Sequence, residues 1–269
     1  MQIITSEFWH RLVDDNSKWH FEFKPNNQKL IFCPMAWIGK FFRTLEENPN
    51  PDWKFTLISG GSDHSLHEFE SCYYIIHNNL IYDTFDRIPS NVKKWYISGS
   101  NVIYDNVKTF IPLGVCDDGP GKENLLNYRL IENSKIYKYY VNWSNHTLER
   151  YKLKERWKND LTGNFLVKES VPWNEFHNDL SHCEYTVCTF GYGLDCYRNY
   201  EALCCDSIPI LLKCKWAEEF ERVMGGCILV DSWLELENKN FNKKPSKPFN
   251  WDLVNTEYWK NLIYEGIDV

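Results

Sequence analysis

The sequence predicts an α/β protein with two lobes, and three observations lead to this prediction. Short apolar strands alternate with helical segments along most of the chain, which is typical of a mostly parallel sheet. The chain has 269 residues, a length that suits one large or two small domains. Residues 185–212, YTVCTFGYGLDCYRNYEALCCDSIPILL, read as a strand, a glycine turn, a helix and a buried strand, which together define a βαβ unit.

Apolar patterns in the first half of the chain predict the elements of the first lobe. Short apolar runs indicate strands, and apolar residues at helical spacing indicate a helix. These elements are strands at 30–33, 55–58, 94–98 and 109–115 and a helix at 35–45. The strand at 55–58 leads into a Gly-rich polar loop at 59–65. The loop at 116–124 is rich in Asp, Gly and Pro. It is the predicted boundary between a lobe of residues 1–115 and a lobe of residues 116–269.

The second half predicts the second lobe by the same patterns. Its strands are expected at 136–141, 163–168, 185–190, 208–212 and 227–230, and its helices at 148–157, 173–181, from about 194, at 216–224 and at 258–264. The stretch 237–250 is rich in Lys, Asn and Pro and is expected to be an exposed loop. We expect the last helix to pack back on the first lobe.

The glycine turn Gly191, Tyr192 and Gly193 follows the strand at 185–190 directly. Such a turn lets the backbone approach a ligand closely. Its free N–H groups and the start of the next helix attract an anion. Because ligands of open α/β sheets bind at the carboxyl ends of the strands, this turn predicts a phosphate site.

The following helix carries three polar residues spaced three apart, Asp195, Arg198 and Glu201. At this spacing they lie on one side of the helix, each rotated slightly from the one before. Arg198 suits a forked bond to phosphate, and the Glu201 carboxylate suits the two hydroxyls of a ribose. Asp195 is expected either to touch a sugar or to cap the helix. The alternative for Arg198 and Glu201 is an ordinary surface ion pair.

Composition excludes several classes of protein. The formal net charge is −7, and no basic cluster indicates a nucleic-acid surface. The amino terminus has no signal-peptide pattern and no apolar run is long enough for a membrane span, so we expect a cytoplasmic protein. The ten cysteines are scattered without a C-x-x-C pair, which favours reduced thiols over disulfides or a zinc site.

The run GYGLDCYRNYEALCCDSIPI resembles the donor-site signature of exostosin-like glycosyltransferases, including their distant xylosyltransferase members. The signature is roughly G-x-G-x-D-x-x-R-x-W-E-A-L-x-x-G-x-I-P-I. The chain departs from it at Tyr200, where Trp is usual, and at Asp206, where Gly is usual. Two further runs, K-K-W-Y-I-S-G-S-N…F-I-P-L-G-V and V-N-W-S-N-H-T…R, are also similar to family patterns, so the resemblance covers roughly residues 55–230.

The resemblance implies a GT-B fold, in which two Rossmann-like lobes face each other across a cleft. It implies transfer of a sugar from a nucleotide sugar, with uridine diphosphate as the expected carrier and xylose as a weak first choice, to a hydroxyl of a glycan or glycoprotein. Inversion of configuration is expected, without an essential metal or other cofactor. Ser144 and Arg150 are implied as further parts of the diphosphate pocket, and Asp63 as the base on the acceptor hydroxyl.

The residues alone leave other interpretations open. Asp63 lies in a Gly-Ser turn, where an Asp often bonds nearby backbone N–H groups. His64 and His67 are expected to be solvated and not a metal pair. A carbohydrate-binding module without catalysis would keep the aromatic residues and loops. A dinucleotide-dependent enzyme is disfavoured, because the turn lacks the third glycine of G-x-G-x-x-G.

Overall fold

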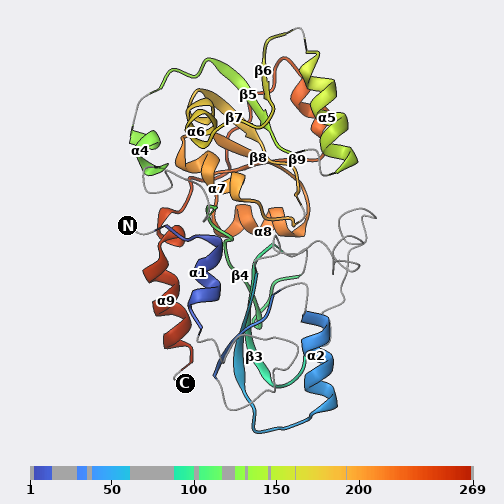
Figure 1. The fold of residues 1–269 in the computed structure, drawn as a ribbon, viewed down its shortest axis with the longest axis vertical. Coiled ribbons are helices and arrows are strands. Elements are labelled where there is room, and N and C mark those ends of the chain that lie inside the picture. Colours follow the sequence, from blue (N-terminus) through green and yellow to red (C-terminus); the bar gives the residue numbers. More distant parts are fainter. Residues whose placement is uncertain are drawn as a thin grey trace. The chain divides into compact units, whose positions relative to one another are not determined.

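The computed structural model describes residues 3–13, 29–34, 38–60, 88–99, 103–116, 125–130, 133–144, 147–160, 162–191 and 193–267. They form two parallel sheets, of four and five strands, and eight α-helices within these ranges (Figure 1). The predicted mixed α/β class with parallel sheets is confirmed. The chain divides into two compact units. The first comprises residues 1–114, 192–195 and 251–269, and the second comprises 115–191 and 196–250.

The sheet of the first unit has the strand order β1-β2-β3-β4. Its strands are β1 (Leu30–Phe32), β2 (Phe55–Ser59), β3 (Val92–Ile97) and β4 (Lys108–Phe110). Helix α2 (Ile38–Glu47) connects β1 to β2 and buries four apolar residues at helical spacing, Ile38, Phe41, Phe42 and Leu45. They pack with Trp95, whose indole donates a 2.9 Å hydrogen bond to the Ser59 hydroxyl. This buried bond links β3 to the end of β2.

The two ends of the chain meet within the first unit. Helix α1 (Ser6–Arg11) lies beside α9 (Thr256–Glu265), where the rings of Trp9 and Trp259 are 5.5 Å apart (Figure 1). The Tyr264 hydroxyl donates a 2.9 Å bond to the Leu12 carbonyl. The 3-10 helix η7 (Trp251–Val254) precedes α9, so the last helix of the sequence belongs to the first unit.

The sheet of the second unit has the strand order β6-β5-β7-β8-β9, and every pair of neighbours is parallel. Its elements, in chain order, are α4 (Leu125–Leu130), β5 (Tyr137–Asn142), α5 (Leu148–Lys158), β6 (Phe165–Lys168), α6 (Trp173–Ser181), β7 (Cys183–Val187), α7 (Tyr197–Cys204), β8 (Ile208–Leu212), α8 (Lys215–Val223), β9 (Ile228–Val230) and the 3-10 helix η6 (Trp233–Glu237).

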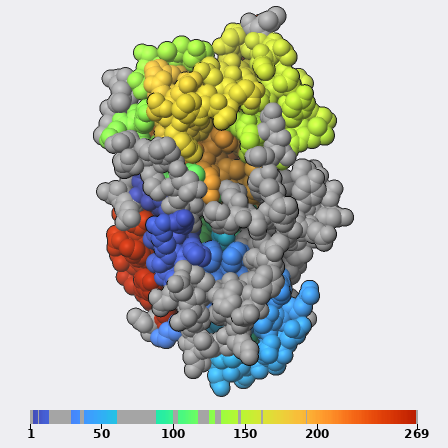
Figure 2. All heavy atoms as spheres, in the orientation of Figure 1, coloured from blue at the N-terminus to red at the C-terminus, as the bar shows by residue number. Residues whose placement is uncertain are grey.

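Both faces of this sheet are covered. Strand β5 shows this, because successive side chains of a strand point to opposite faces. Tyr139 stacks on Phe165 at 4.6 Å and shares a core cluster with Trp157 of α5, whereas Tyr140 packs against Phe176 of α6 at 5.8 Å. Helix α5 also presents side chains to solvent, which appear yellow-green in the space-filling view (Figure 2).

The structure corrects several predicted elements. Helix α7 begins at Tyr197, not near Leu194, and β7 ends at Val187 instead of Phe190. Strand β4 ends at Phe110, five residues before the predicted end. Helices α1 and α4 were not predicted; both are short, with six residues each. The stretch 238–250 is a loop as predicted, but it is not wholly exposed, because Phe241 is buried against Tyr139 and Tyr185.

Two glycines hold this loop against the end of α8. Gly225 and Gly226 both have φ +70°, a conformation that side chains rarely adopt. Gly226 N donates a 3.0 Å bond to the Lys247 carbonyl. A Cβ at Gly225 would lie 2.4 Å from the Pro248 carbonyl oxygen. Non-bonded contacts of a Cβ in proteins are essentially never this short. The loop therefore needs glycine here for space as well as for φ.

Gly225→Ala is expected to lower the free energy of unfolding of the second unit more than Gly163→Ala does. Gly163 also has a positive φ, +69°, but its Cβ would meet nothing within 4 Å. The Gly163 variant should lose about 1 kcal/mol for the unfavourable φ, and the Gly225 variant at least about 1 to 2 kcal/mol more, because the Pro248 carbonyl must move. Chemical denaturation of both variants measures this, and equal losses would contradict the steric explanation.

Candidate functional site

The candidate site lies at the carboxyl edge of the second sheet. Strands β5 and β7 are parallel neighbours, with Tyr140 paired to Thr186. Their carboxyl ends therefore meet at the same edge, which is where open α/β sheets bind ligands. The chain leaves β5 through an exposed Ser144 and leaves β7 toward Gly191. The structure thus brings two of the predicted site segments to one edge.

Arg150 is the best-anchored residue of this edge. It lies in the first turn of α5, whose N-cap Thr147 accepts a 3.2 Å bond from Arg150 N. Its side chain reaches the chain beyond β7, where Nε donates to Thr189 Oγ1 at 3.2 Å and Nη2 donates to the Thr189 carbonyl at 3.1 Å. Arg150 is only 5% exposed. A buried guanidinium is stable only when it is hydrogen-bonded, and Thr189 supplies two acceptors.

Gly191 gives this guanidinium the space it needs. A Cβ at Gly191 would lie 3.1 Å from Arg150 Nη2 and 3.3 Å from the Cys196 sulfur. The Cys196 thiol also points to the Thr189 carbonyl, at 3.7 Å. A side chain at position 191 would therefore require Arg150 or Cys196 to shift by a few tenths of an ångström, whereas the φ of Gly191 is not positive and does not itself favour glycine.

Helix α7 carries the other two charged residues of the site, Arg198 and Glu201. The helix begins at Tyr197 with Cys196 as its N-cap, and the Cys196 side chain makes no capping bond. The prediction that Asp195, Arg198 and Glu201 lie on one helix is therefore wrong for Asp195, which precedes the helix. Asp195 is also not the N-cap residue. Arg198 and Glu201 remain one turn apart on α7.

The Arg198 guanidinium lies over the Phe176 ring of α6, with Cζ 5.9 Å from the ring centre. This is a cation–π contact. Arg198 Nε is buried and has no hydrogen-bond partner among the residues that the structure describes. Buried donors without a partner are uncommon in proteins, and they are often explained by a ligand or water. Arg198 therefore has a bonding position open that an anion can occupy.

Glu201 is buried, with 4% of its surface exposed. Burial raises its pKa to about 7, and the nearby Arg198 charge and a hydrogen bond from the backbone N–H of Cys116 oppose this rise in part. The alternative interpretation, an ordinary surface ion pair of Arg198 and Glu201, does not hold, because the Glu201 carboxyl group is buried. A second donor, such as a ligand hydroxyl, would stabilise its charged form.

Two residues of the predicted phosphate loop belong to the first unit. Gly193 and Asp195 lie in the segment 192–195, which groups with that unit. The Asp195 carboxylate is 3% exposed and accepts a 3.0 Å bond from the backbone N–H of Leu113. Its Cβ lies 3.3 Å from the position that a Cβ on Gly99 would take. Asp195 thus holds the chain beyond β4 in the first unit.

Four predicted or considered residues lie outside the described residues: Tyr192, Asp63, His64 and His67. Their assignments stay predictions, as do the assignments of the two lobes to acceptor and donor. Sequence reasoning missed Thr189, Phe176 and Cys116. Thr189 lies two residues after β7, and a polar residue near a strand's carboxyl end is a usable signal. Phe176 and Cys116 gave no such signal, because only the fold brings them to α7.

No group of three or more His, Cys, Asp or Glu side chains is placed to hold a metal ion in the part of the chain that the structure describes. The expected independence from metal stays a prediction. None of the described helices is long and apolar enough to span a membrane. No protein-family model and no curated protein sequence matches this chain.

Glu201→Gln is expected to stabilise the second unit at high pH. The folded-state pKa of about 7 exceeds the ordinary value of 4.5, so the folded protein binds a proton that the unfolded chain has already lost. Stability therefore falls as pH rises from about 4.5 to 7, by up to about 3 kcal/mol. A glutamine cannot ionise, so the variant's stability relative to wild type should increase over this range.

The measurement is denaturant unfolding of both proteins at pH 5 and pH 8. Glu218→Gln is the matched control, because Glu218 lies in the same unit on α8 but is exposed. The difference in free energy of unfolding between Glu218→Gln and wild type should be the same at pH 5 and pH 8. If the free energy of unfolding of Glu201→Gln differs from that of wild type by the same amount at both pH values, ionisation of the buried Glu201 carboxyl does not destabilise the fold.

Proposed function

We propose that the protein is a glycosyltransferase that takes a sugar from a nucleotide sugar, with uridine diphosphate as the preferred carrier. One observation carries the proposal: the carboxyl edge of the second sheet combines a buried, doubly hydrogen-bonded Arg150 with Gly191, which lies close against its guanidinium. Arg198 and Glu201 follow on the next helix. Guanidinium groups and backbone N–H groups suit a diphosphate, and a carboxylate suits the ribose hydroxyls.

The proposal includes the GT-B arrangement, in which the second unit binds the donor and the first unit receives the acceptor. The resemblance of GYGLDCYRNYEALCCDSIPI to the exostosin-like signature supports it. The two departures from that signature have simple structural explanations. Tyr200 packs in the core against Phe220 at 5.7 Å. Asp206 adopts φ +57°, the left-handed conformation that explains the usual glycine and that Asp tolerates. Xylose as the sugar and the cytoplasm as the location stay predictions.

In the proposed reaction, an acceptor hydroxyl oxygen attacks the anomeric carbon of the donor sugar. The bond from that carbon to the diphosphate oxygen breaks, and its electron pair leaves with the diphosphate. Asp63 takes the proton of the hydroxyl as general base. Arg198, Arg150 and the N–H groups near Gly191 stabilise the negative charge of the leaving group. One displacement of this kind inverts the configuration of the sugar.

Two substitutions should separate the phosphate contact from the ribose contact. Glu201→Ala should weaken binding of both uridine diphosphate and uridine, by about 1.5 to 3 kcal/mol, because both ligands carry the ribose. Arg198→Ala should weaken uridine diphosphate by a similar amount and leave uridine unchanged. Calorimetric titrations at pH 8 measure these affinities, with Arg222→Ala as the control because Arg222 is exposed on α8.

Binding of uridine diphosphate that is equal in wild type and in folded Arg198→Ala and Glu201→Ala variants would refute the proposed roles. If wild type binds no uridine diphosphate at all, the proposed function fails. A sugar-binding module without a diphosphate site would then be the better interpretation.

The role of Asp63 is tested separately. Asp63→Asn should keep the affinity for uridine diphosphate and lose transfer, because an amide cannot accept the proton of the acceptor hydroxyl. The assay is release of uridine diphosphate from nucleotide sugars mixed with a panel of glycan acceptors. His64→Gln in the adjacent position serves as the control and should remain active. Near-normal turnover by Asp63→Asn would remove Asp63 as the base.

A further inference from the structure

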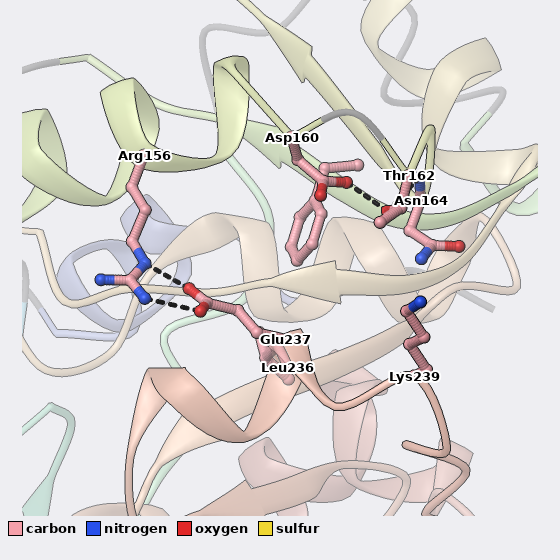
Figure 3. Close-up of a pocket in the computed structure, with 8 residues that line it drawn as sticks. Arg156, Asp160, Thr162, Asn164, Leu236, Glu237 and Lys239 are labelled. Atoms are coloured by element: carbon pink, nitrogen blue, oxygen red, sulfur yellow. Dashed lines mark hydrogen bonds and ion pairs between the residues drawn. The ribbon is translucent and has the colours of Figure 1, made fainter.

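A polar pocket lies in the second unit (Figure 3), and none of the candidate donor-site residues lines it. Its volume is about 180 Å³, and the lining residues used below are Arg156, Asp160, Asn164, Phe165, Glu237 and Lys239. Phe165 is the first residue of β6. Lys138, near the start of β5, donates from Nζ to the Lys239 carbonyl at 3.5 Å. The pocket therefore lies at the amino-terminal edge of the sheet.

The candidate donor site lies at the opposite edge. Strand β5 has six residues, so the two edges are about 20 Å apart along it. No residue of this pocket takes part in the proposed donor site. A ligand here would therefore be bound independently of the nucleotide sugar.

The walls of the pocket are formed by contacts within the protein. Arg156 and Glu237 form a bidentate ion pair in one wall, in which Arg156 Nη2 lies 2.6 Å from Glu237 Oε2. The Phe165 ring stacks on Trp157 at 5.0 Å with 12° between the ring planes, and on Tyr139 at 4.6 Å. The stacking orders the Phe165 side of the pocket, which lowers the entropy lost on binding there.

The polar groups of the pocket supply both donors and acceptors. Lys239 and Asn164 contribute only backbone atoms to hydrogen bonds within the described part of the chain, through the Lys239 carbonyl and the Asn164 N–H. The Lys239 ammonium and the Asn164 amide are therefore available to a ligand. The Asp160 carboxylate accepts the Thr162 hydroxyl and keeps further lone pairs.

The charges of the lining cancel, since Arg156 and Lys239 balance Asp160 and Glu237. An anion would meet two carboxylates and a cation would meet two positive groups. An uncharged ligand rich in hydroxyls meets neither penalty and uses donors and acceptors alike. The volume is below the range of about 300–1,000 Å³ that is typical of drug-sized ligands, so the space suits one ring.

We propose that this pocket binds a single uncharged sugar ring, such as the terminal residue of a glycan. The sugar hydroxyls bond Lys239, Asn164 and Asp160, and its C–H groups lie against the edge of the Phe165 ring, whose faces stack on Trp157 and Tyr139. The pocket is thus a second carbohydrate site that holds a glycan away from the reacting centre. It goes beyond the proposed transferase function and does not depend on it.

The test is saturation-transfer difference NMR on the full chain with the methyl glycosides of glucose, galactose and xylose. At least one glycoside should give a signal, and excess uridine diphosphate should leave that signal unchanged. Asn164→Leu keeps the side-chain size but removes its hydrogen bonds, and should weaken the bound glycoside about tenfold, equivalent to about 1.4 kcal/mol. Lys239→Ala should have a similar effect.

Lys244→Ala is the matched control, because Lys244 lies in the same loop and pairs with Glu184 at 3.4 Å outside the pocket. It should bind glycosides as wild type does. Lys239 and Lys244 are exposed and Asn164 is half-buried, so thermal unfolding of each variant checks that it folds. The proposal is overturned if no glycoside gives a signal, if Asn164→Leu and Lys239→Ala bind like wild type, or if uridine diphosphate displaces the glycoside. Binding of inorganic phosphate in place of glycosides would also overturn it.

Discussion

The bond between Arg150 and Thr189 is the constraint on which the carboxyl edge of the second sheet depends. It joins the start of α5 to the chain beyond β7, although the two segments are about forty residues apart. A buried guanidinium that loses its acceptors costs several kcal/mol, so the two segments cannot separate without penalty. The absence of a Cβ at Gly191 follows from this constraint, because a side chain there would push against Arg150.

The polar groups of α7 differ from Arg150, because their bonding is incomplete in the described residues. Arg198 has a buried Nε without a partner, and burial raises the pKa of Glu201 to about 7. The unpartnered Arg198 Nε and the buried Glu201 carboxylate each lower the stability of the fold. Groups that a fold stabilises incompletely are often those that bind a ligand, and a diphosphate with a ribose would satisfy both. Arg150 is thus already held by Thr189 without a ligand, whereas a ligand would complete the bonding of Arg198 and Glu201.

The sequence predicted the parallel strands well, because a buried strand is a short apolar run and needs no knowledge of the rest of the chain. It placed the start of α7 too early because Asp195 looks like a helix residue by spacing. In the structure, the Asp195 carboxylate is used by Leu113 N, which is remote in the sequence. The cation–π contact of Arg198 with Phe176 was not predictable for the same reason. Local patterns thus define elements, whereas the bonding of individual site residues depends on the tertiary fold.

Helix α5 explains how one sheet can present two separate polar sites. Its buried residues are Arg150, Lys154 and Trp157, at helical spacing, so two polar side chains hold it on the sheet together with the apolar contacts of Trp157 and Leu153. Lys154 is buried and donates to the Trp143 carbonyl at 2.9 Å and to Glu169 at 2.8 Å. Directional bonds fix the helix more specifically than apolar contacts alone. Because both ends of α5 are anchored, its first turn can shape the donor edge while Arg156, near its last turn, forms a wall of the second pocket.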